Sequence, residues 1–276
     1  MSIFDEPKID CHTHILDPVG FPYAPDTHYR PAGQETGTAA QLLHVMDAHG
    51  VRFALLVGPN SGYGLDNRCM LDAIAHSGGR FKGIAVVGNE ATRTQLEALK
   101  AAGVVGVAWN VTFYGVDYYA DAARLLSELE ALDMFVQIQV EHDQLVPLLP
   151  MLQRSGARIL IDHCGRPTPE AGLDEPGFKA LLGLATTRRA AVKLSGYVKF
   201  SRTPYPHPDI QPFIAALVDA YTPNACMWAS DWPNLRAAGH MDYGLAVKFV
   251  EELFPDPTDR HQVLWKTPDA LFRFSA

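Results

Sequence analysis

The feature that most constrains the fold is a regular alternation of short apolar runs with longer amphipathic ones. The short runs are rich in β-branched residues and predict eight strands, at residues 8–12, 53–58, 82–88, 104–111, 134–140, 158–164, 191–196 and 226–232. Between them, apolar residues recur at i, i+3, i+4 and i+7, which predicts helices, for example at 38–50, 93–103, 119–132 and 211–221. Strands that are apolar on both faces are typical of a parallel sheet covered by helices.

Eight such units in 276 residues predict one slightly distorted (β/α)8 TIM barrel, a single domain over residues 1–276. An open doubly wound sheet rarely needs eight repeats, and no glycine-rich phosphate loop follows the first strand. Two stretches rich in proline, glycine and aromatic residues follow strands one and seven, at 17–37 and 197–209. We expect ordered loops there, at the end of the barrel where active sites are built. Two roles stay open for these loops: a lid over the active site, or a connection with a structural role alone.

Composition and charge restrict the partners. Hydrophobic residues make up 47% and charged residues 20%, which allows a sizeable core. The 23 basic and 31 acidic residues leave a net charge of −8, which disfavours nucleic acid and anionic membranes but allows a small anionic substrate. We expect neither a signal peptide nor a membrane-spanning helix, because MSIFDEPK lacks a basic and an apolar region and no apolar run reaches about 18 residues. The four cysteines form no CxxC pair, which fits reduced thiols in a cytoplasmic protein.

Polar residues gather at the predicted C-terminal ends of three strands. His12 and His14 point to one side of the first strand because side chains alternate, His163 ends the sixth strand and Asp231 the eighth. In a closed barrel these ends meet at one mouth. Three imidazoles and a carboxylate can be a metal site and equally a set of acids and bases. For Asp231 the alternative is a helix N-cap, because SDWPNL can begin a helical turn.

The same residues carry a family resemblance. The segments DCHTH, DHCGRP and SDWP resemble the motifs of strands one, six and eight in the amidohydrolase superfamily. Within it, the chain resembles the group of 2-pyrone-4,6-dicarboxylate lactonases and sugar lactonases. Three further segments, LDNRCMLDAI, RFKGIAVV and LWKTPDALFRF, are similar to that group, so the resemblance covers essentially the whole chain.

The resemblance implies a hydrolase that opens a lactone of a carboxylated or hydroxylated small molecule. Asp231 would handle the proton of the attacking water, and the three histidines would either hydrogen-bond the lactone carbonyl or bind a divalent ion. This agrees with the chemistry, since lactone hydrolysis needs a base for water and a positive or donor group where the oxyanion develops.

A metal ion is a second expectation that the resemblance shapes. His12, His14, His163 and Asp231 can together hold one ion, for which Zn²⁺ is the best candidate. Binuclear members of the superfamily use a lysine in strand four and a histidine in strand five. Here GVAWNV has no lysine and Gln139 stands in strand five, so a two-metal centre is not expected. Because members of the resembled group work without metal, we expect no required cofactor, with ion capture by the same cluster still allowed.

Contacts to the substrate are where the chain departs from the resembled lactonases. They carry an arginine in strand four where this chain has Ala108, which weakens the case for a dicarboxylate substrate. The side chains that we expect to bind the substrate are Arg166, Tyr29, Asn110, Gln139, Tyr197 and Lys199. Asn110 and Gln139 suit a hydroxylated substrate, and for the loop side chains other than Arg166 plain exposure is an equal alternative. Glu141 is expected to be a solvated surface residue rather than a ligand or ion-pair partner.

Three other functions stay open. One is a Zn-dependent decarboxylase of an aromatic or unsaturated acid, since another branch of the superfamily keeps the same His and Asp set around zinc; Gln139 counts against it, because that branch expects a histidine there. The others are a lactone isomerase and a non-catalytic barrel that binds a metabolite. In each case the expected partner is a small-molecule lactone or carboxylate, and the sequence leaves the oligomeric state open.

Overall fold

An eight-stranded parallel sheet forms the centre of the protein. The computed structural model describes residues 2–237, 239 and 241–274. Each strand pairs in parallel with the next, in the order β1 to β8. The strands are β1 (Lys8–Thr13), β2 (Val51–Val57), β3 (Phe81–Val86), β4 (Val104–Asn110), β5 (Phe135–Gln139), β6 (Arg158–Ile161), β7 (Ala190–Leu194) and β8 (Cys226–Trp228). This confirms the predicted (β/α)8 barrel.

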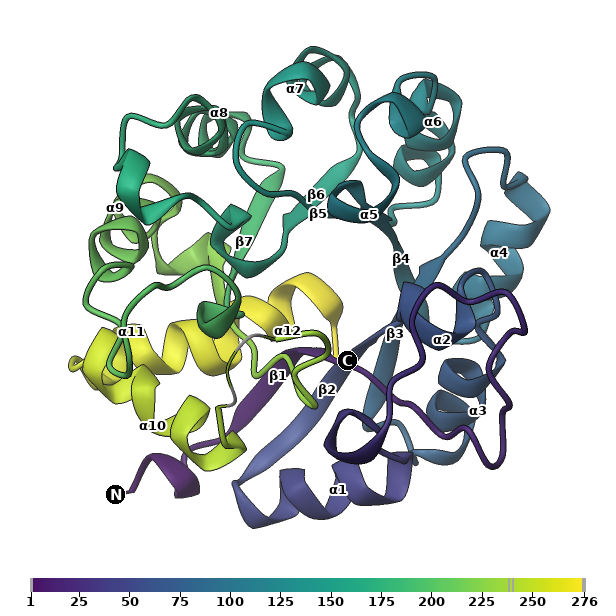
Figure 1. Cartoon of the computed structure of the whole chain (residues 1–276), viewed down its shortest axis with the longest axis horizontal. Coiled ribbons are helices and arrows are strands. Elements are labelled where there is room, and N and C mark those ends of the chain that lie inside the picture. Colours follow the sequence, from purple (N-terminus) through teal and green to yellow (C-terminus); the bar gives the residue numbers. More distant parts are fainter. Residues whose placement is uncertain (1, 238, 240, 275–276) are drawn as a thin grey trace.

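Helices surround the sheet, as Figure 1 shows in a view down the barrel. The longer ones are α1 (Ala39–Ala48), α3 (Arg68–His76), α4 (Arg93–Ala101), α6 (Ala123–Ala131), α7 (Leu145–Arg154), α8 (Pro176–Leu184), α9 (Gln211–Tyr221) and α10 (Tyr243–Leu253). The shorter ones are α2 (Asn60–Tyr63), α5 (Val111–Tyr114), α11 (Pro257–His261) and α12 (Thr267–Phe272). Thr38 and Thr92 begin α1 and α4 with capping boxes, which satisfy backbone N–H groups of the first turn. No described helix is long and apolar enough to cross a membrane.

The barrel closes between β1 and the segment that follows β8. Thr13 pairs with Trp232 in a parallel bridge. The backbone N–H of Asp231 donates to the carbonyl of His12 at 3.0 Å, and that of His14 donates to Trp232 at 2.9 Å. Because β8 itself is only three residues long, this pairing completes the ring and places Asp231 beside the end of β1.

The N-terminal end of the barrel is plugged by α12. Phe272 packs against Phe135 inside the barrel, with ring centroids 5.4 Å apart. At the starts of β3 and β6, Lys82 donates to the carbonyl of Phe272 at 2.6 Å and the guanidinium of Arg158 lies over the Phe135 ring at 3.9 Å. With this end filled, the opposite, C-terminal end is the one that can admit a ligand.

Most predicted strands end one or two residues early, but the sixth and eighth end three and four residues early, and functional residues lie on the turns that follow these two. β6 ends at Ile161 and β8 at Trp228, whereas the apolar runs predicted strands to residues 164 and 232. His163 has φ 50° and Asp231 has φ 61°, a left-handed backbone that cannot continue a strand. These turns point the two side chains back over the barrel axis.

The long loop after β1 is ordered against the outside of the barrel mouth. In residues 17–37, the N–H of Ala24 donates to the carbonyl of Gly62 at 3.0 Å, and the N–H of Gly62 donates to that of Tyr29 at 3.0 Å. The loop therefore lies along α2, as the dark purple trace in Figure 1 shows. The second predicted loop, 197–209, begins with the single turn Tyr197–Lys199.

Candidate active site

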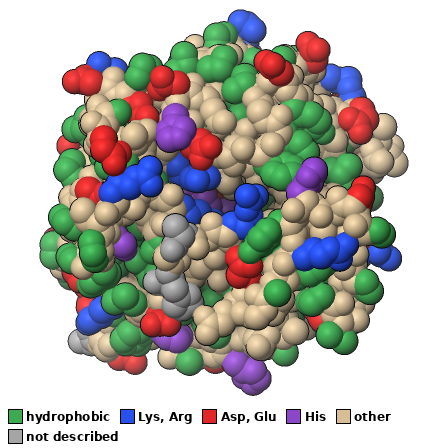
Figure 2. Space-filling model, in the orientation of Figure 1, with side chains coloured by type: hydrophobic (Ala, Val, Ile, Leu, Met, Phe, Trp, Pro, Cys, Tyr) green, Lys and Arg blue, Asp and Glu red, His purple; other side chains and the backbone are tan. Residues whose placement is uncertain are grey.

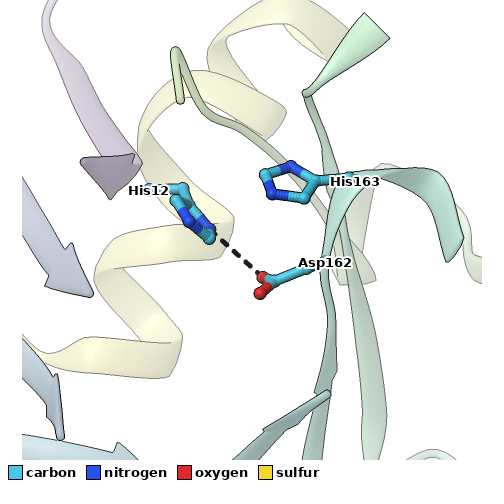
Figure 3. Close-up of side chains that lie close together, drawn as sticks. All are labelled: His12, Asp162 and His163. Carbon is cyan, nitrogen blue, oxygen red and sulfur yellow. Dashed lines mark hydrogen bonds and ion pairs between the residues drawn. The ribbon is translucent and has the colours of Figure 1, made fainter. Parts of the chain in front are cut away.

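Three imidazoles converge on one carboxylate at the open end of the barrel. The Nε2 atoms of His12, His14 and His163 lie 3.8, 3.7 and 3.7 Å from Oδ1 of Asp231. His12 and His14 extend from the end of β1, and Figure 3 shows His163 approaching His12 from the end of β6. All four side chains are buried. The structure thus brings together the four residues that the sequence singled out.

Each ring is oriented by a contact on its other nitrogen. His14 Nδ1 donates to the carbonyl of Val57 at 2.8 Å, and His163 Nδ1 is hydrogen-bonded with Ser195 Oγ at 2.9 Å. His12 Nδ1 lies 3.2 Å from Asp162 Oδ1, the contact dashed in Figure 3. With Nδ1 engaged in every ring, the three Nε2 atoms are left to face the shared centre.

Gly196 is required for this packing. Its φ is +64°, and a Cβ added there would lie 2.6 Å from His163 Nδ1. Only glycine combines that backbone conformation with so close an approach. The residue therefore lets the turn after β7 pass directly behind the His163 ring.

Burial and neighbouring charges together shift the pKa of Asp231 and those of two of the imidazoles, His12 and His163, downward. Burial alone would raise the pKa of Asp231, but Lys199, with Nζ 2.7 Å from Oδ2, and His163 lower it well below its usual value. Burial lowers the pKa of His12 to about 4 and that of His163 well below 6.5. These directions favour an ionised Asp231 beside neutral His12 and His163, and an ionised carboxylate is the form that can accept a proton.

A second layer of charged groups lies beneath His12, and sequence reasoning did not identify it. Lys193 on β7 is completely buried and pairs with Asp162 Oδ1 at 3.1 Å. Lys193 also donates to Gln137 on β5, and Gln137 donates to Asp162 Oδ2 at 2.8 Å. The available signal was a lysine inside the apolar run AVKLSG and an aspartate inside ILIDHC, since buried charges in strands need a partner.

The cavity at this end of the barrel has a volume of about 250 Å³, and of the four central residues His12 and His14 are among those that line it. One side of it is neutral and hydrogen-bonded: Asn110 donates to Asn60 at 3.2 Å, Thr112 to Asn110 at 2.7 Å and Gln139 to Thr112 at 3.1 Å. The lining also contains three cationic side chains, Arg166, Lys199 and Arg236, and two acidic ones, Glu141 and Asp162. Figure 2 shows this hollow at the centre of the face, with histidine at its floor and Lys and Arg around it.

The structure separates the expected substrate contacts into two groups. Arg166, Asn110, Gln139 and Lys199 line the cavity. Tyr29 and Tyr197 are not among the lining residues: the Tyr29 hydroxyl donates to Glu35 within its own loop, and the Tyr197 ring is buried against Phe249, with centroids 5.1 Å apart.

One further expectation, for Glu141, is corrected, and the alternative role of Asp231 is excluded. Glu141 lines the cavity and pairs with Arg166 at 3.0 Å, so it is not simply a solvated surface residue. Asp231 is not a helix N-cap: it lies in a turn, where its carbonyl accepts from Asn234, and the next described helix begins at Tyr243. Glu141 is thus a carboxylate in the cavity lining that the sequence analysis left outside the site.

The four central residues also fit a single divalent ion. Nε2 of His12 and His14 are 3.2 Å apart, and each Nε2 is 3.7–3.8 Å from Asp231 Oδ1. Ligand atoms around one tetrahedral zinc ion lie roughly 3.3–3.4 Å apart. Among the described residues, His163 Nε2 and Asp231 Oδ1 are buried without a hydrogen-bond partner, whereas Asp231 Oδ2 pairs with Lys199 at 2.7 Å. Two overlapping groups could each hold an ion, namely His12, His14 and Asp231, and His12, Asp162 and His163. The residues at this end of the barrel thus include groups that could hold an ion, and His12 belongs to both of them.

The pKa of His12 leads to a pH prediction for protein stripped of ions. Between about pH 6.5 and about pH 4 the unfolded chain binds a proton at His12 more readily than the folded protein, so this group makes stability fall as the pH falls. Activity that needs a neutral His12 should stay level down to about pH 5 and be lost near pH 4. A pH profile of kcat/KM, with circular dichroism at each point, checks this, and an inflection near pH 6.5 would contradict it.

Comparisons with known proteins place this site in a family. The model of the amidohydrolase family matches residues 9–274. A 4-sulfomuconolactone hydrolase from Rhizobium radiobacter is 30% identical over 273 residues, covering 95% of this chain and 89% of its own length. A 2-pyrone-4,6-dicarboxylate hydrolase from Comamonas testosteroni is 27% identical over 277 residues, 96% of this chain and 89% of its own.

A solved structure agrees over nearly the whole chain. The crystal structure of a probable 2-pyrone-4,6-dicarboxylic acid hydrolase from Acinetobacter baumannii, with citric acid bound, is 28% identical. It superimposes with a TM-score of 0.88 and covers 96% of this chain and 99% of its own. The barrel, the strand-end histidines and aspartate, and these matches lead to one conclusion: the chain belongs to the amidohydrolase family.

Proposed function

We propose that this protein is a lactone hydrolase whose substrate is a small cyclic ester with a carboxylate or hydroxyl groups. The observation that carries the proposal is the buried Asp231 carboxylate, held within 3.8 Å of three imidazole nitrogens and next to His12 and His14, which line an open cavity. The site thus offers a base and an electrophilic group a few ångströms apart, as ester hydrolysis requires. Two relatives named as hydrolases of lactones, 27–30% identical to this chain, support the same reaction class.

In this proposal Asp231 moves the proton. Its carboxylate accepts a proton from water while the water oxygen bonds to the lactone carbonyl carbon, which gives a tetrahedral intermediate with an oxyanion. When the bond from that carbon to the ring oxygen breaks, Asp231 returns the proton to the ring oxygen, and the product is an open-chain hydroxy acid or enol acid. Lys199, 2.7 Å from Asp231, holds the carboxylate ionised before the substrate arrives.

The imidazole cluster stabilises the carbonyl oxygen as it becomes negative. N–H donors aimed at that position act in a buried site, where such interactions are stronger than in water. One divalent ion held by His12, His14, His163 and Asp231 would supply Lewis-acid polarisation at the same place.

The cysteines of the described chain are all reduced and buried, which supports a cytoplasmic location for this chemistry.

Arg166 is proposed to bind a substrate carboxylate. Its Nε is buried without a hydrogen-bond partner among the described residues, while its terminal nitrogen pairs with Glu141 at 3.0 Å. Arg166→Gln should raise KM for carboxylated lactones by about 10–100-fold, the loss of one charge-assisted hydrogen bond, and leave neutral sugar lactones unaffected. Steady-state kinetics on both substrate classes checks this. Arg202→Gln, which alters an exposed arginine outside the cavity lining, is the matched control. Equal changes for both classes would remove Arg166 from anion binding.

Labelled water tests the reaction class. Turnover in oxygen-18 water should place one labelled oxygen in the new carboxylate of the product, seen as a mass increase, because the water oxygen attacks the carbonyl carbon. An isomerase would return an unlabelled lactone. A decarboxylase would release carbon dioxide without ring opening. Either of these results would reject the hydrolase.

A further inference from the structure

The contacts around His12 constrain which of its nitrogens carries a proton. Nδ1 faces two groups of opposite kind: Asp162 Oδ1 at 3.2 Å and the Lys193 ammonium at 3.3 Å. An ionised carboxylate only accepts hydrogen bonds, and an ammonium only donates them. A protonated Nδ1 therefore bonds to Asp162, and an unprotonated Nδ1 bonds to Lys193.

The other nitrogen of His12 is tied to His14. Nδ1 of His14 faces the Val57 carbonyl at 2.8 Å, so it must carry a proton, and Nε2 of a neutral His14 then has a lone pair. His12 Nε2 lies 3.2 Å from that atom. Without an ion between them, this contact is attractive only when His12 Nε2 is the donor. With an ion between them, both Nε2 atoms turn lone pairs to it, and the single proton of neutral His12 is on Nδ1.

We propose that Lys193 and Asp162 select the tautomer of His12, so that the same site works in two states. In the ion-free state Lys193 donates to Nδ1, and Nε2–H is free to turn from His14 to a substrate oxygen. In the ion-bound state Nδ1–H donates to Asp162, and Nε2 is a ligand. A neutral imidazole holds one N–H proton in both states, so the exchange needs no net uptake or release of protons by His12.

The surroundings of Lys193 suit this role. The ammonium has three protons, and three acceptors surround it: Asp162 Oδ1, Gln137 Oε1 and His12 Nδ1. When His12 changes tautomer, Lys193 keeps the first two contacts, so the buried charge is never left unpaired. Lys193 is thus a positioning residue that acts through His12. In this proposal, Lys193 affects both how tightly the site binds a metal and whether His12 can act on the substrate without one.

Ring nitrogen-15 NMR on histidine-labelled protein tests the proposal directly. After chelation, His12, assigned by its absence in His12→Asn, should be protonated at Nε2, and after zinc is added it should be protonated at Nδ1. In the Lys193→Met variant, His12 should be protonated at Nδ1 even without zinc. This variant should also bind zinc roughly tenfold more tightly in a chelator-competition assay. Asp162→Asn should show the reverse, with Nε2–H kept and zinc binding weakened about 10–100-fold.

Lys8→Met is the matched control for loss of a buried lysine. Lys8 is also completely buried, but its ammonium donates to Ile3 and Glu6 at the closed end of the barrel. It should leave the His12 spectrum and the zinc affinity unchanged. Three results would overturn the proposal. His12 has the same tautomer with and without zinc, both of its nitrogens are protonated, or Lys193→Met and Lys8→Met give the same His12 spectrum and zinc affinity. If Lys193→Met does not fold, the two wild-type spectra decide alone.

The substrate-oxygen part of this inference rests on the proposed lactone hydrolysis, but the tautomer and zinc readouts do not. The expected NMR result without hydrolysis of any lactone would therefore reject the proposed function and keep the role of Lys193. Hydrolysis with an unchanged His12 spectrum would do the opposite.

Discussion

Asp231→Asn is expected to lower kcat for lactone hydrolysis by about 10³-fold or more, the range over which a positioned base accelerates proton transfer. Asparagine is nearly isosteric with aspartate, but its amide cannot accept the proton of the attacking water. Asp231 is fully buried beside three imidazoles, so no base dissolved in the solvent can reach its position and replace it. The measurement is a single-turnover rate at saturating lactone, with circular dichroism and a melting curve on the same sample.

The control for this variant is Asp143→Asn, which changes a carboxylate that accepts from Gly177 outside the cavity lining. It should keep wild-type turnover. An Asp231→Asn protein that is folded and turns over at a near-normal rate would remove Asp231 from the mechanism. A variant that has lost its fold would be replaced by Asp231→Glu, where the retained carboxylate is displaced by one methylene and kcat should fall while the melting temperature holds.

His12→Asn is expected to reduce kcat by about 10²-fold or more while KM changes by less than about threefold. Asparagine keeps a polar atom near the position of Nδ1, beside Asp162, but removes Nε2 from the shared centre. A group that acts on the developing oxyanion contributes in the transition state and little in the ground state, so its loss appears in kcat. Michaelis–Menten kinetics on an intact lactone separates the two parameters.

His49→Asn serves as the control for histidine loss, because His49 is bonded to Val45 in α1 and lies outside the cavity lining. It should leave both kinetic parameters unchanged. An effect of His12→Asn confined to KM would show that His12 binds the substrate and does not stabilise the transition state.

Much of the fold could be predicted because strands and helices leave local patterns. All eight apolar runs became strands, and the run predicted at 104–111 became β4 over Val104–Asn110. The runs toward 164 and 232 ended early because the left-handed turns at His163 and Asp231 are set by packing at the barrel mouth. Hydrophobicity gives no signal for such turns, since the residues in them are as buried as those in the strand.

The central cluster could be predicted for a different reason. His12, His14, His163 and Asp231 lie at or just after the ends of strands that any closed barrel brings together, so topology alone was enough. Side chains on long loops have no such constraint. The direction of Tyr29 is set by its bond to Glu35, and that of Tyr197 by packing on Phe249, neither of which is encoded by periodicity.

Lys193 and Asp162 show what sequence reasoning can recover with more attention to burial. Both stand in apolar runs that predict strands, and β6 and β7 are neighbours in the sheet. A lysine and an aspartate at the ends of adjacent buried strands should be expected to pair, because neither charge is tolerated there alone. Their contact with His12 depends on the inward tilt of the strands and required the structure.

The most direct test of the central claim is acid release, followed with a pH indicator, from a panel of sugar-acid lactones, muconolactones and pyrone carboxylates. Each is assayed before and after exhaustive chelation, with Asp231→Asn beside the wild type. We predict hydrolysis of at least one carboxylated or hydroxylated lactone by the wild type and none by the variant. If no lactone of the panel releases acid, and an aromatic acid releases carbon dioxide when zinc is supplied, the account is contradicted and the site is that of a decarboxylase.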